Sequence, residues 1–231
     1  MVKHVVLLTG ADGQLGKTIQ ALWSESGLAE RYELHPVGRP QLDITSAGEV
    51  AETFAKIKPA VVINCSAYTA VDKAESDSEN AFLINQKGPE ILSNCCAKNS
   101  AKLIHVSTDF VFSGAFDKPI TLAQATNPAG VYGASKRAGE LAILKQLPNT
   151  AVIFRTSWLY SSFNANFVKT MLRLSETRDT LSVVADQIGG PTPARDIASA
   201  CLMIAQHLQD DPSKSGTYHY TGAPSVSWAD F

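Results

Sequence analysis

Short apolar runs along the chain alternate with longer stretches in which apolar residues recur at helical spacing. The runs 4–9 (HVVLLT), 59–65 (PAVVINC) and 150–157 (TAVIFRTS) are rich in β-branched residues and predict buried strands. The stretches 46–58 (SAGEVAETFAKIK) and 131–147 (VYGASKRAGELAILKQL) have the spacing typical of helices. Strands that alternate with helices predict an α/β fold, in which a doubly wound parallel sheet is covered by helices on both faces.

The remaining elements extend this alternation along the whole chain. Further strands are expected at 32–37, 101–107 and 181–186, and further helices at 14–25, 79–100, 166–174 and 194–208. Ser46 is a suitable N-cap for its helix, and Gly88-Pro89 predicts a bend in the helix that contains it. The longest loops, 108–130 and 156–166, follow predicted strands, where α/β folds usually keep their functional sites.

Composition excludes several classes of function. The 231 residues are 45% hydrophobic and 18% charged, with a net charge of −2 and no basic run, so neither nucleic acid nor a membrane surface is an expected partner. The first apolar run is too short for a signal peptide, and no stretch has the apolar length of a membrane span. The four cysteines form no CxxC pair and the histidines are scattered, so we expect a cytoplasmic protein with reduced thiols and no metal site.

The segment TGADGQLG, between the first strand and the first helix, is the first candidate site. Glycine at this turn permits unusual backbone angles and lets a pyrophosphate approach the main chain at the helix N-terminus. The spacing is GxxGxxG, one residue longer than the familiar dinucleotide fingerprint, and a tight turn without a ligand is the alternative. The cofactor-binding residues predicted here are Gly10, Gly13, Gln14, Leu15 and Gly16.

The end of the second strand, PVGRPQLDI, concerns the choice of cofactor. An acidic residue here usually binds the ribose 2′-hydroxyl of NAD, whereas an arginine accommodates the 2′-phosphate of NADP. This chain has Gly38 and Arg39 instead of a carboxylate, which favours NADPH and leaves NADH as the alternative. A solvated loop arginine without a ligand is the other interpretation.

Three side chains that the fold should bring together predict a reductase. Thr108 follows the fourth strand, and Tyr132 and Lys136 are four residues apart on one face of a helix. The two hydroxyls could donate hydrogen bonds to a carbonyl oxygen while a hydride attacks its carbon. A nearby ammonium favours the ionised phenol, so Lys136 is expected to lower the pKa of Tyr132.

These features together resemble the extended short-chain dehydrogenase/reductases, and several segments are more specific. The segments NCSAYTAVDKAESD, VSTDFVFSG, VYGASKRAGE, FRTSWLY, NFVKTMLRL and DQIGGPT, in this order, resemble the dTDP-4-dehydrorhamnose reductase family over essentially the whole chain. The resemblance implies NADPH-dependent reduction of dTDP-4-dehydro-6-deoxy-L-mannose to dTDP-L-rhamnose. It also implies a Rossmann core at 1–160, followed at 161–231 by a mixed region that adds to the sheet edge and forms part of a substrate lobe. A homodimer is compatible with this interpretation.

The resemblance also implies roles for individual residues. Thr108, Tyr132 and Lys136 match the catalytic positions, and Tyr132 and Lys136 also contact the cofactor. The other implied cofactor contacts are Asp43 and Ile44 at the adenine, Ala67, Tyr68 and Thr69 after the third strand, and Asn85. The implied substrate contacts are Thr69, Val71, Thr108 and Trp158. Asn85 could instead be a helix-surface amide, and Trp158 a core aromatic residue.

The sequence departs from the family pattern at two places. Phe110 replaces a common tyrosine, which removes one hydroxyl near the substrate. Family members continue beyond the final SVSWADF with a segment that helps to hold the nucleotide diphosphate. The substrate lobe is therefore expected to be incomplete in the sequence as given.

Three other functions are alternatives to this one. A nucleotide-sugar dehydratase commonly has Asp-Glu after the threonine, whereas this chain has Asp109-Phe110. An epimerase retains its NAD, which fits Gly38-Arg39 less well than an exchanging NADPH does. A non-catalytic dinucleotide-binding regulatory subunit is disfavoured by the intact Thr-Tyr-Lys set, although a fold alone does not fix a function.

Overall fold

The computed structural model describes residues 3–114 and 118–231, and its centre is a parallel sheet of six strands. The strands are β1 (His4–Thr9), β2 (Tyr32–Val37), β3 (Pro59–Asn64), β4 (Lys102–Thr108), β5 (Ala151–Thr156) and β9 (Gly216–His219). Their order is β2-β1-β3-β4-β5-β9, with every neighbouring pair parallel. β2 lies on one side of β1 and β3 on the other, so the strand order reverses between β1 and β3. In doubly wound folds, ligands bind beside such a switch point, at the carboxyl ends of the strands.

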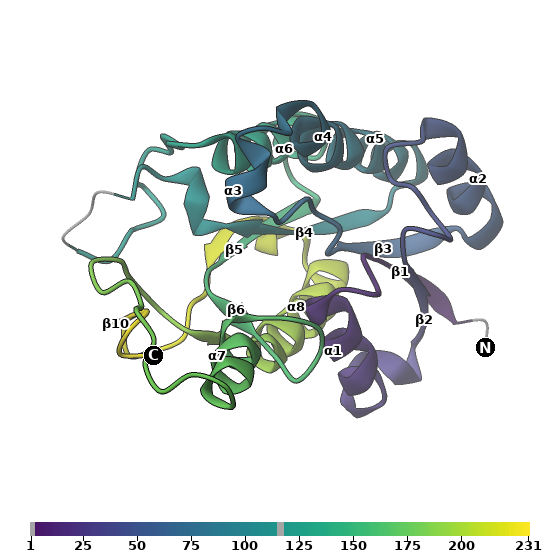
Figure 1. Cartoon of the computed structure of the whole chain (residues 1–231). Helices are drawn as coiled ribbons and strands as arrows, with labels where there is room; N and C mark the ends of the chain where they lie inside the picture. Colours follow the sequence, from purple (N-terminus) through teal and green to yellow (C-terminus); the bar gives the residue numbers. More distant parts are fainter. Residues whose placement is uncertain (1–2, 115–117) are drawn as a thin grey trace.

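Helices cover both faces of the sheet, as predicted, and give three layers (Figure 1). One face carries α1 (Gln14–Leu22) and α8 (Ala194–Asp210). The other carries α2 (Ala47–Ile57), α5 (Gly88–Asn99) and α6 (Val131–Gln146). The short helices α3 (Val71–Ala74) and α4 (Ser78–Phe82) precede a π-helical turn at Leu83–Lys87, and α7 (Phe167–Ser175) follows the sheet region. This arrangement is a Rossmann-like α/β fold.

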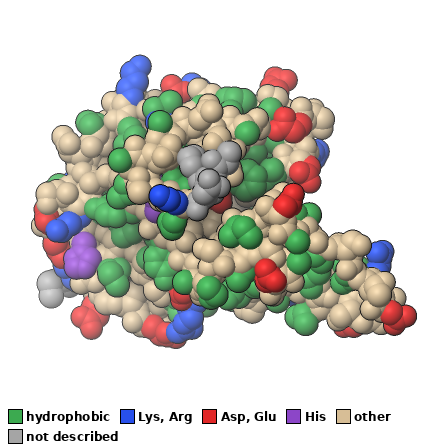
Figure 2. Space-filling model, turned by 90° about the vertical axis from the view of Figure 1, so that its left-hand side faces the viewer, with side chains coloured by type: hydrophobic (Ala, Val, Ile, Leu, Met, Phe, Trp, Pro, Cys, Tyr) green, Lys and Arg blue, Asp and Glu red, His purple; other side chains and the backbone are tan. Residues whose placement is uncertain are grey.

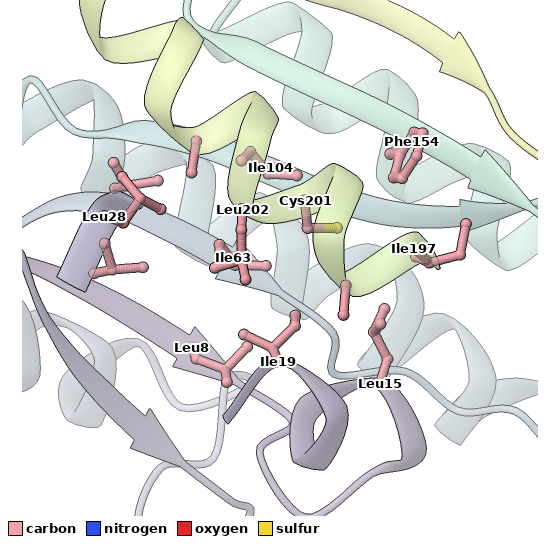
Figure 3. Packing of buried hydrophobic residues seen from close by; sticks show 14 of the residues in the cluster. Leu8, Leu15, Ile19, Leu28, Ile63, Ile104, Phe154, Ile197, Cys201 and Leu202 are labelled. Atoms are coloured by element: carbon pink, nitrogen blue, oxygen red, sulfur yellow. The ribbon is translucent and has the colours of Figure 1, made fainter. Parts of the chain in front are cut away.

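Alternating side chains of the strands build a separate core on each face of the sheet. Leu8, Ile63 and Ile104 point towards α1 and α8, where they meet Ile19 and Leu202 (Figure 3). The neighbouring strand residues, Leu7, Val62 and Leu103, belong to the second core, beneath α2, α5 and α6. Because successive strand residues face opposite ways, a strand covered on both faces must be apolar throughout. That requirement explains the uninterrupted apolar runs of the sequence.

Two small sheets follow the main one. β6 (Leu159–Tyr160) pairs with β8 (Thr192–Pro193), and β7 (Ile188–Gly189) pairs with β10 (Val226–Ser227). On the face shown in Figure 2, acidic and basic side chains are interspersed among exposed apolar ones, and part of the molecule projects from the main body. The small sheets bring residues distant in sequence next to the carboxyl ends of β4 and β5.

Three local predictions need correction. The strand predicted at 181–186 is absent: this run is irregular and mostly exposed, because no neighbouring strand pairs with it. The sixth strand of the main sheet is instead β9, which was not predicted and pairs with β5. A bend was expected at Gly88-Pro89, but the helical irregularity is the π-helical turn Leu83–Lys87, which ends just before Gly88. By contrast, Ser46 caps α2 as expected, since its side chain accepts a hydrogen bond from the Glu49 N–H.

The described residues contain neither a membrane-spanning helix nor a cluster of metal ligands. Across residues 3–114 and 118–231, no helix is long and apolar enough to cross a membrane. The same ranges hold no cluster of three or more His, Cys, Asp or Glu side chains that could bind a metal ion.

Candidate active site

A cleft of about 770 Å³ opens at the carboxyl ends of β1, β3, β4 and β5. It lies beside the switch point, where the fold is expected to bind a ligand. Fifteen of the residues singled out in the sequence line it: Gly10, Gly13, Gln14, Leu15, Gly16, Arg39, Asp43, Ile44, Ala67, Thr69, Val71, Thr108, Tyr132, Lys136 and Trp158. Tyr68 and Asn85 lie outside this lining. The fold therefore gathers most of the predicted site in one place.

The glycine-rich turn closes tightly between β1 and α1. Gly10 has φ +68°, and a Cβ there would lie 2.6 Å from the carbonyl carbon of Cys65 on the adjacent chain segment. A Cβ on Gly16 would lie 2.3 Å from the Gly10 carbonyl oxygen. Gly13 is the N-cap of α1 and has no capping side chain, so the start of this helix stays open to the cleft. This is the geometry that lets a phosphate approach backbone N–H groups at a helix N-terminus.

The opposite end of the cleft, beyond β2, contains one cation and two carboxylates. Arg39 is exposed and lines the cleft, as do Asp12 and Asp43. A Cβ on Gly38 would overlap the Asp12 carboxylate, so a larger residue at this position would displace the Asp12 side chain. Hydrogen bonds from the Thr45 hydroxyl, at 2.7 Å, and backbone N–H, at 2.9 Å, lower the pKa of Asp43. The Arg39 charge also acts to lower the pKa of Asp43, which is held in a local turn, and the exposed Arg39 side chain is within reach of a ligand anion in the cleft.

The three candidate catalytic residues meet on one wall of the cleft. Thr108 ends β4, and its hydroxyl donates to the Asp109 carboxylate at 3.1 Å and accepts from the Phe110 N–H at 3.2 Å. A side-chain hydrogen bond also joins Thr108 to Tyr132. Phe110, which is 46% exposed, packs edge-on against the Tyr132 ring at a centroid distance of 5.5 Å. The two hydroxyls predicted to act on one carbonyl oxygen are therefore neighbours.

The electrostatics of Tyr132 differ from the expectation. Burial of the phenol raises its pKa to about 12; the Thr108 hydrogen bond acts to lower the pKa, and the Asp109 carboxylate acts to raise it. The expected lowering of the Tyr132 pKa by Lys136 is not found. The phenol therefore keeps its proton at neutral pH, which is the state that a proton donor needs.

Lys136 is directed into the sheet instead. Its side chain is 2% exposed, and its Nζ donates to the Val106 carbonyl at 2.7 Å and lies 3.2 Å from His105 Nε2. Burial lowers the pKa of Lys136 to about 8, against the opposing effects of Glu140 and Cys65. An amine with this pKa can gain or lose a proton near physiological pH.

Asn85 holds the wall of the cleft rather than lining it. Its side chain, only 1% exposed, accepts from the Tyr68 N–H at 2.8 Å and donates to the Tyr68 carbonyl at 3.0 Å and to the Ser135 hydroxyl at 3.0 Å. The alternative of a helix-surface amide is thus wrong. By joining the loop after β3 to α6, Asn85 fixes the positions of Ala67 and Thr69 relative to α6.

A buried ion-pair network anchors α6 to the sheet. The Glu140 carboxylate, fully buried, accepts from the Ser107 hydroxyl at 2.6 Å and from two nitrogens of Arg155 at 2.7 and 2.9 Å. Arg137 donates to the same carboxylate at 2.8 Å. Because these residues come from α6, β4 and β5, the network fixes the helix that carries Tyr132 and Lys136.

Two stacked tryptophans form the wall near the small sheets. Trp158 has φ +46°, an uncommon conformation for a bulky residue, and its ring stacks on Trp228 at 3.6 Å and 12°. A Cβ on Gly189 would lie 2.5 Å from Trp158 Cε2, so β7 needs glycine at this point. Both tryptophans line the cleft, and Trp158 is therefore more than a core aromatic residue.

The sequence prediction missed several residues of the cleft, among them Thr156 and Trp228. Thr156 ends β5 directly opposite Thr108, and its Oγ1 is buried without a hydrogen-bond partner. Its place at the end of a strand was a usable signal, because polar residues there face the site. Trp228 joins the cleft only through the pairing of β7 with β10, which nothing in the sequence indicated.

Comparison with known proteins gives a consistent result. The family model described as the RmlD substrate binding domain matches residues 4–231. A dTDP-4-dehydrorhamnose reductase of Aggregatibacter actinomycetemcomitans is 43% identical over 98% of this chain and 76% of that protein. A dTDP-4-keto-6-deoxy-D-glucose reductase of Streptomyces niveus is 37% identical over 97% of this chain and 75% of its own length.

A solved structure of a relative contains NADP. The dTDP-4-dehydrorhamnose reductase of Bacillus anthracis, crystallised with NADP, is 39% identical and has a TM-score of 0.91, covering 99% of this chain and 78% of that one. Identity at this level over nearly the whole chain establishes common descent as well as a common fold. The chain therefore belongs to the RmlD family of dTDP-4-dehydrorhamnose reductases, within the extended short-chain dehydrogenase/reductases.

Proposed function

We propose that this protein uses NADPH to reduce dTDP-4-dehydro-6-deoxy-L-mannose to dTDP-L-rhamnose. The observation that carries the proposal is the meeting of Thr108, Tyr132 and Lys136 on one wall of the cleft that also holds the glycine turn. This arrangement suits reduction of a carbonyl, since it offers two hydroxyl groups to one oxygen beside a dinucleotide site.

The residues present fit NADPH along the whole cleft. The Gly10–Gly16 turn and the open N-terminus of α1 suit the pyrophosphate. Arg39 suits the 2′-phosphate, because a guanidinium binds phosphate through a rigid fork of donors. Asp43 and Ile44 border the adenosine end, and Lys136 lies at the nicotinamide end beside Tyr132. Ala67 and Thr69 line the wall between these ends, and Asn85 and Tyr68 support that wall from behind.

In this reaction the residues of the protein hold the sugar and protonate it. NADPH, when bound, supplies the hydride that attacks the C4 carbonyl carbon. Thr108 turns its single hydroxyl proton from Asp109 to the carbonyl oxygen of the bound sugar. Tyr132 transfers its hydroxyl proton to the same oxygen as the carbon–oxygen double bond becomes a single bond. The high pKa of Tyr132 keeps that proton in place until negative charge develops on the substrate.

The sugar ring is assigned to the part of the cleft lined by Trp158, Thr69 and Val71. A flat aromatic face suits the methyl group and ring carbons of a deoxysugar. The unpartnered Thr156 hydroxyl lies beside Thr108 and offers a further hydrogen bond within the cleft. We assign residues 1–160 to the cofactor half and 161–231 to the sheet edge and the substrate lobe.

NADPH oxidation measured with each of two sugars tests this function. The proposed substrate is dTDP-4-dehydro-6-deoxy-L-mannose, and the comparison is dTDP-4-keto-6-deoxy-D-glucose, the sugar named for the Streptomyces niveus relative. The expected result is faster turnover of the first, with dTDP-L-rhamnose as the product identified by chromatography. Faster turnover of the second would reassign the substrate, and no turnover of either would leave only dinucleotide binding.

A further inference from the structure

A buried chain of hydrogen bonds runs behind the cleft from β1 to α6. The Thr9 hydroxyl donates to Asn64 Oδ1 at 2.7 Å, Asn64 Nδ2 lies 2.9 Å from His105 Nδ1, and His105 Nε2 lies 3.2 Å from Lys136 Nζ. All four side chains are at most 2% exposed. Burying a run of polar groups costs free energy unless each group is hydrogen-bonded. The donor and the acceptor of each bond can therefore be assigned in turn.

A backbone N–H fixes the direction in which these hydrogen bonds run, from donor to acceptor. Ser66 donates its N–H to Asn64 Oδ1 at 3.0 Å, and a backbone N–H can only donate. The amide oxygen of Asn64 therefore faces Ser66 and Thr9, and the amide nitrogen faces His105. Turning the amide over would set its NH₂ group against the Ser66 N–H and leave that donor without an acceptor.

The tautomer of His105 follows from this direction. Because Asn64 Nδ2 donates, His105 Nδ1 accepts, and a neutral imidazole then carries its proton on Nε2. Burial together with the nearby Lys136 holds the pKa of His105 well below its usual range, so the ring is neutral. The Nε2–H consequently points at Lys136 Nζ, where a neutral amine can accept a hydrogen bond and an ammonium ion cannot.

We propose that His105, held by Asn64 in its Nε2–H tautomer, is a positioning residue that orients the Lys136 side chain and favours release of its proton. This inference rests on the proposed function in one respect, namely that Lys136 serves the reaction at Tyr132. It assigns a role to a histidine that otherwise counts as an ordinary core residue. An amine able to exchange its proton near working pH is better placed to restore a proton to the site after each turnover.

The other groups around Lys136 do not supply the same effect. Tyr132 and Glu140 share its helix, and Cys65 faces it from the end of β3. Glu140 favours the ammonium form, but its charge is also bound by Arg155 and Arg137. Asp109, on the far side of Tyr132, acts on the phenol. Of the groups named here, only His105 presents a hydrogen-bond donor to the amine.

Nuclear magnetic resonance of the full chain tests the proposal without any substrate. Nitrogen shifts of the histidine rings report the tautomer, and loss of one signal set in His105→Gln assigns it. The expected form is neutral and protonated on Nε2 from about pH 6 to 9, the range that brackets the unperturbed His pKa of about 6.5. An Nδ1–H tautomer or an imidazolium in that range would overturn the inference.

The Lys136 titration, followed at its Cε, supplies the second measurement. Glutamine at 105 can turn its amide oxygen towards the amine and accept from the ammonium, so the Lys136 pKa should rise by about one unit, a tenfold change in proton affinity. The control is His207→Gln, at an exposed position on α8, which should leave the titration unchanged. An unchanged pKa in folded His105→Gln would contradict the proposal.

A second variant, at Asn64, tests the tautomer of His105 independently. In Asn64→Asp, a carboxylate oxygen faces His105 Nδ1 and should move the imidazole proton to Nδ1, leaving Nε2 to accept from Lys136. The tautomer shifts should then reverse even if His105→Gln does not fold. Since neither measurement needs turnover, loss of the proposed enzymatic activity and loss of this hydrogen-bond arrangement are separate outcomes.

Discussion

At the scale of single residues, the proposed reduction depends on Tyr132 as the proton donor. Its pKa of about 12 means that the phenol is protonated throughout the physiological range. An oxidation that needs tyrosinate would be disfavoured by the same pKa, whereas a reduction needs the phenol. The hydrogen bond to Thr108 acts to lower this pKa, but the effect of burial is larger.

Replacing Tyr132 with phenylalanine should therefore remove the proton donor and little else. We expect kcat of Tyr132→Phe to fall by ~10²–10⁴, the range typical of losing a general acid. The edge-on contact with Phe110 needs only the ring, so folding should be retained. Steady-state kinetics with the nucleotide sugar, alongside NADPH titration of the same variant, measure both effects. Near-normal turnover would exclude Tyr132 as the donor.

Arg39 should determine which cofactor is preferred. Arg39→Ala should weaken NADPH binding by about 10- to 150-fold, equivalent to the roughly 1.5–3 kcal/mol of a charge-assisted hydrogen bond. NADH lacks the 2′-phosphate, so its affinity should change little. Calorimetric titration with each cofactor measures the difference, with Arg178→Ala, an exposed arginine outside the cleft lining, as the control. An equal loss for both cofactors would show that Arg39 does not contact the phosphate.

At the scale of elements, the site depends on how α6 is fastened to β4 and β5. Glu140 is the centre of that attachment, because one buried carboxylate receives hydrogen bonds from three other side chains. Burial acts to raise the pKa of Glu140, but the hydrogen bonds from Arg155 and Ser107 outweigh it and leave the pKa below its ordinary value of 4.5. The folded state consequently favours the ionised form.

Glu140→Gln should destabilise the fold by roughly 3–5 kcal/mol, since it leaves the buried Arg155 charge without its partner. Urea unfolding measures the loss. The control is Glu90→Gln, which breaks the exposed pair with Lys87 and should cost less than about 1 kcal/mol. A loss as small as the control's would mean that the network does not anchor α6.

The pH dependence of this effect follows from the sign of the shift. Because the pKa of Glu140 is lower in the folded state, its contribution is present above the ordinary value of 4.5 and is lost as pH falls below it, towards the folded pKa. The gap in stability between wild type and Glu140→Gln should therefore narrow as pH falls from 6 towards 3, the range around an unperturbed Glu pKa of about 4.3. A gap independent of pH would argue against ionised Glu140.

Elements differ in how well the sequence predicts them. The central residues of β1, β3 and β5 are buried and apolar, a pattern visible in the sequence alone. β9 is a four-residue edge strand with partly exposed positions, and only its pairing with β5 makes it a strand. The run 181–186 shows the reverse, because strand-forming residues without a partner strand remain irregular.

The same contrast applies to the site. Residues placed by local sequence, such as the glycine turn and the Tyr132–Lys136 pair, could be predicted because a turn or a helix fixes their spacing. Trp228 could not, since it reaches the cleft through pairing between segments far apart in the chain. The direction of the Lys136 side chain was equally hidden, because it depends on His105 and Val106 of another element.

β7 offers a test of how an element positions an aromatic wall. Gly189→Ala would place a methyl group 2.5 Å from Trp158, whose other face is stacked on Trp228, so the indole must move. We expect kcat/KM for the nucleotide sugar to fall roughly 10- to 100-fold, as displacements of about 1 Å can do. NADPH affinity should be unchanged. Gly48→Ala on α2, where a Cβ meets nothing within 4 Å, is the matched control.

At the scale of the whole molecule, the cleft exists only in the folded chain. Its lining comes from the turn after β1, the loops after β2 and β3, the ends of β4 and β5, α6 and the small sheets. No short stretch could bind a dinucleotide alone, so NADPH should bind the native state and not the unfolded one. Binding must then stabilise the fold as a unit.

NADPH should accordingly raise the melting temperature. At a concentration about 100 times its Kd, a ligand specific for the native state adds about 2.7 kcal/mol, and about 2–4 °C per kcal/mol for a domain of this size gives a shift of roughly 5–11 °C. Differential scanning calorimetry measures it. Tyr132→Phe should keep the full shift, because it removes chemistry rather than binding, whereas Arg39→Ala should lose most of it with NADPH and little with NADH. If saturating NADPH left the melting temperature unchanged, the cleft would not bind this cofactor. The proposed NADPH-dependent reduction would then be wrong.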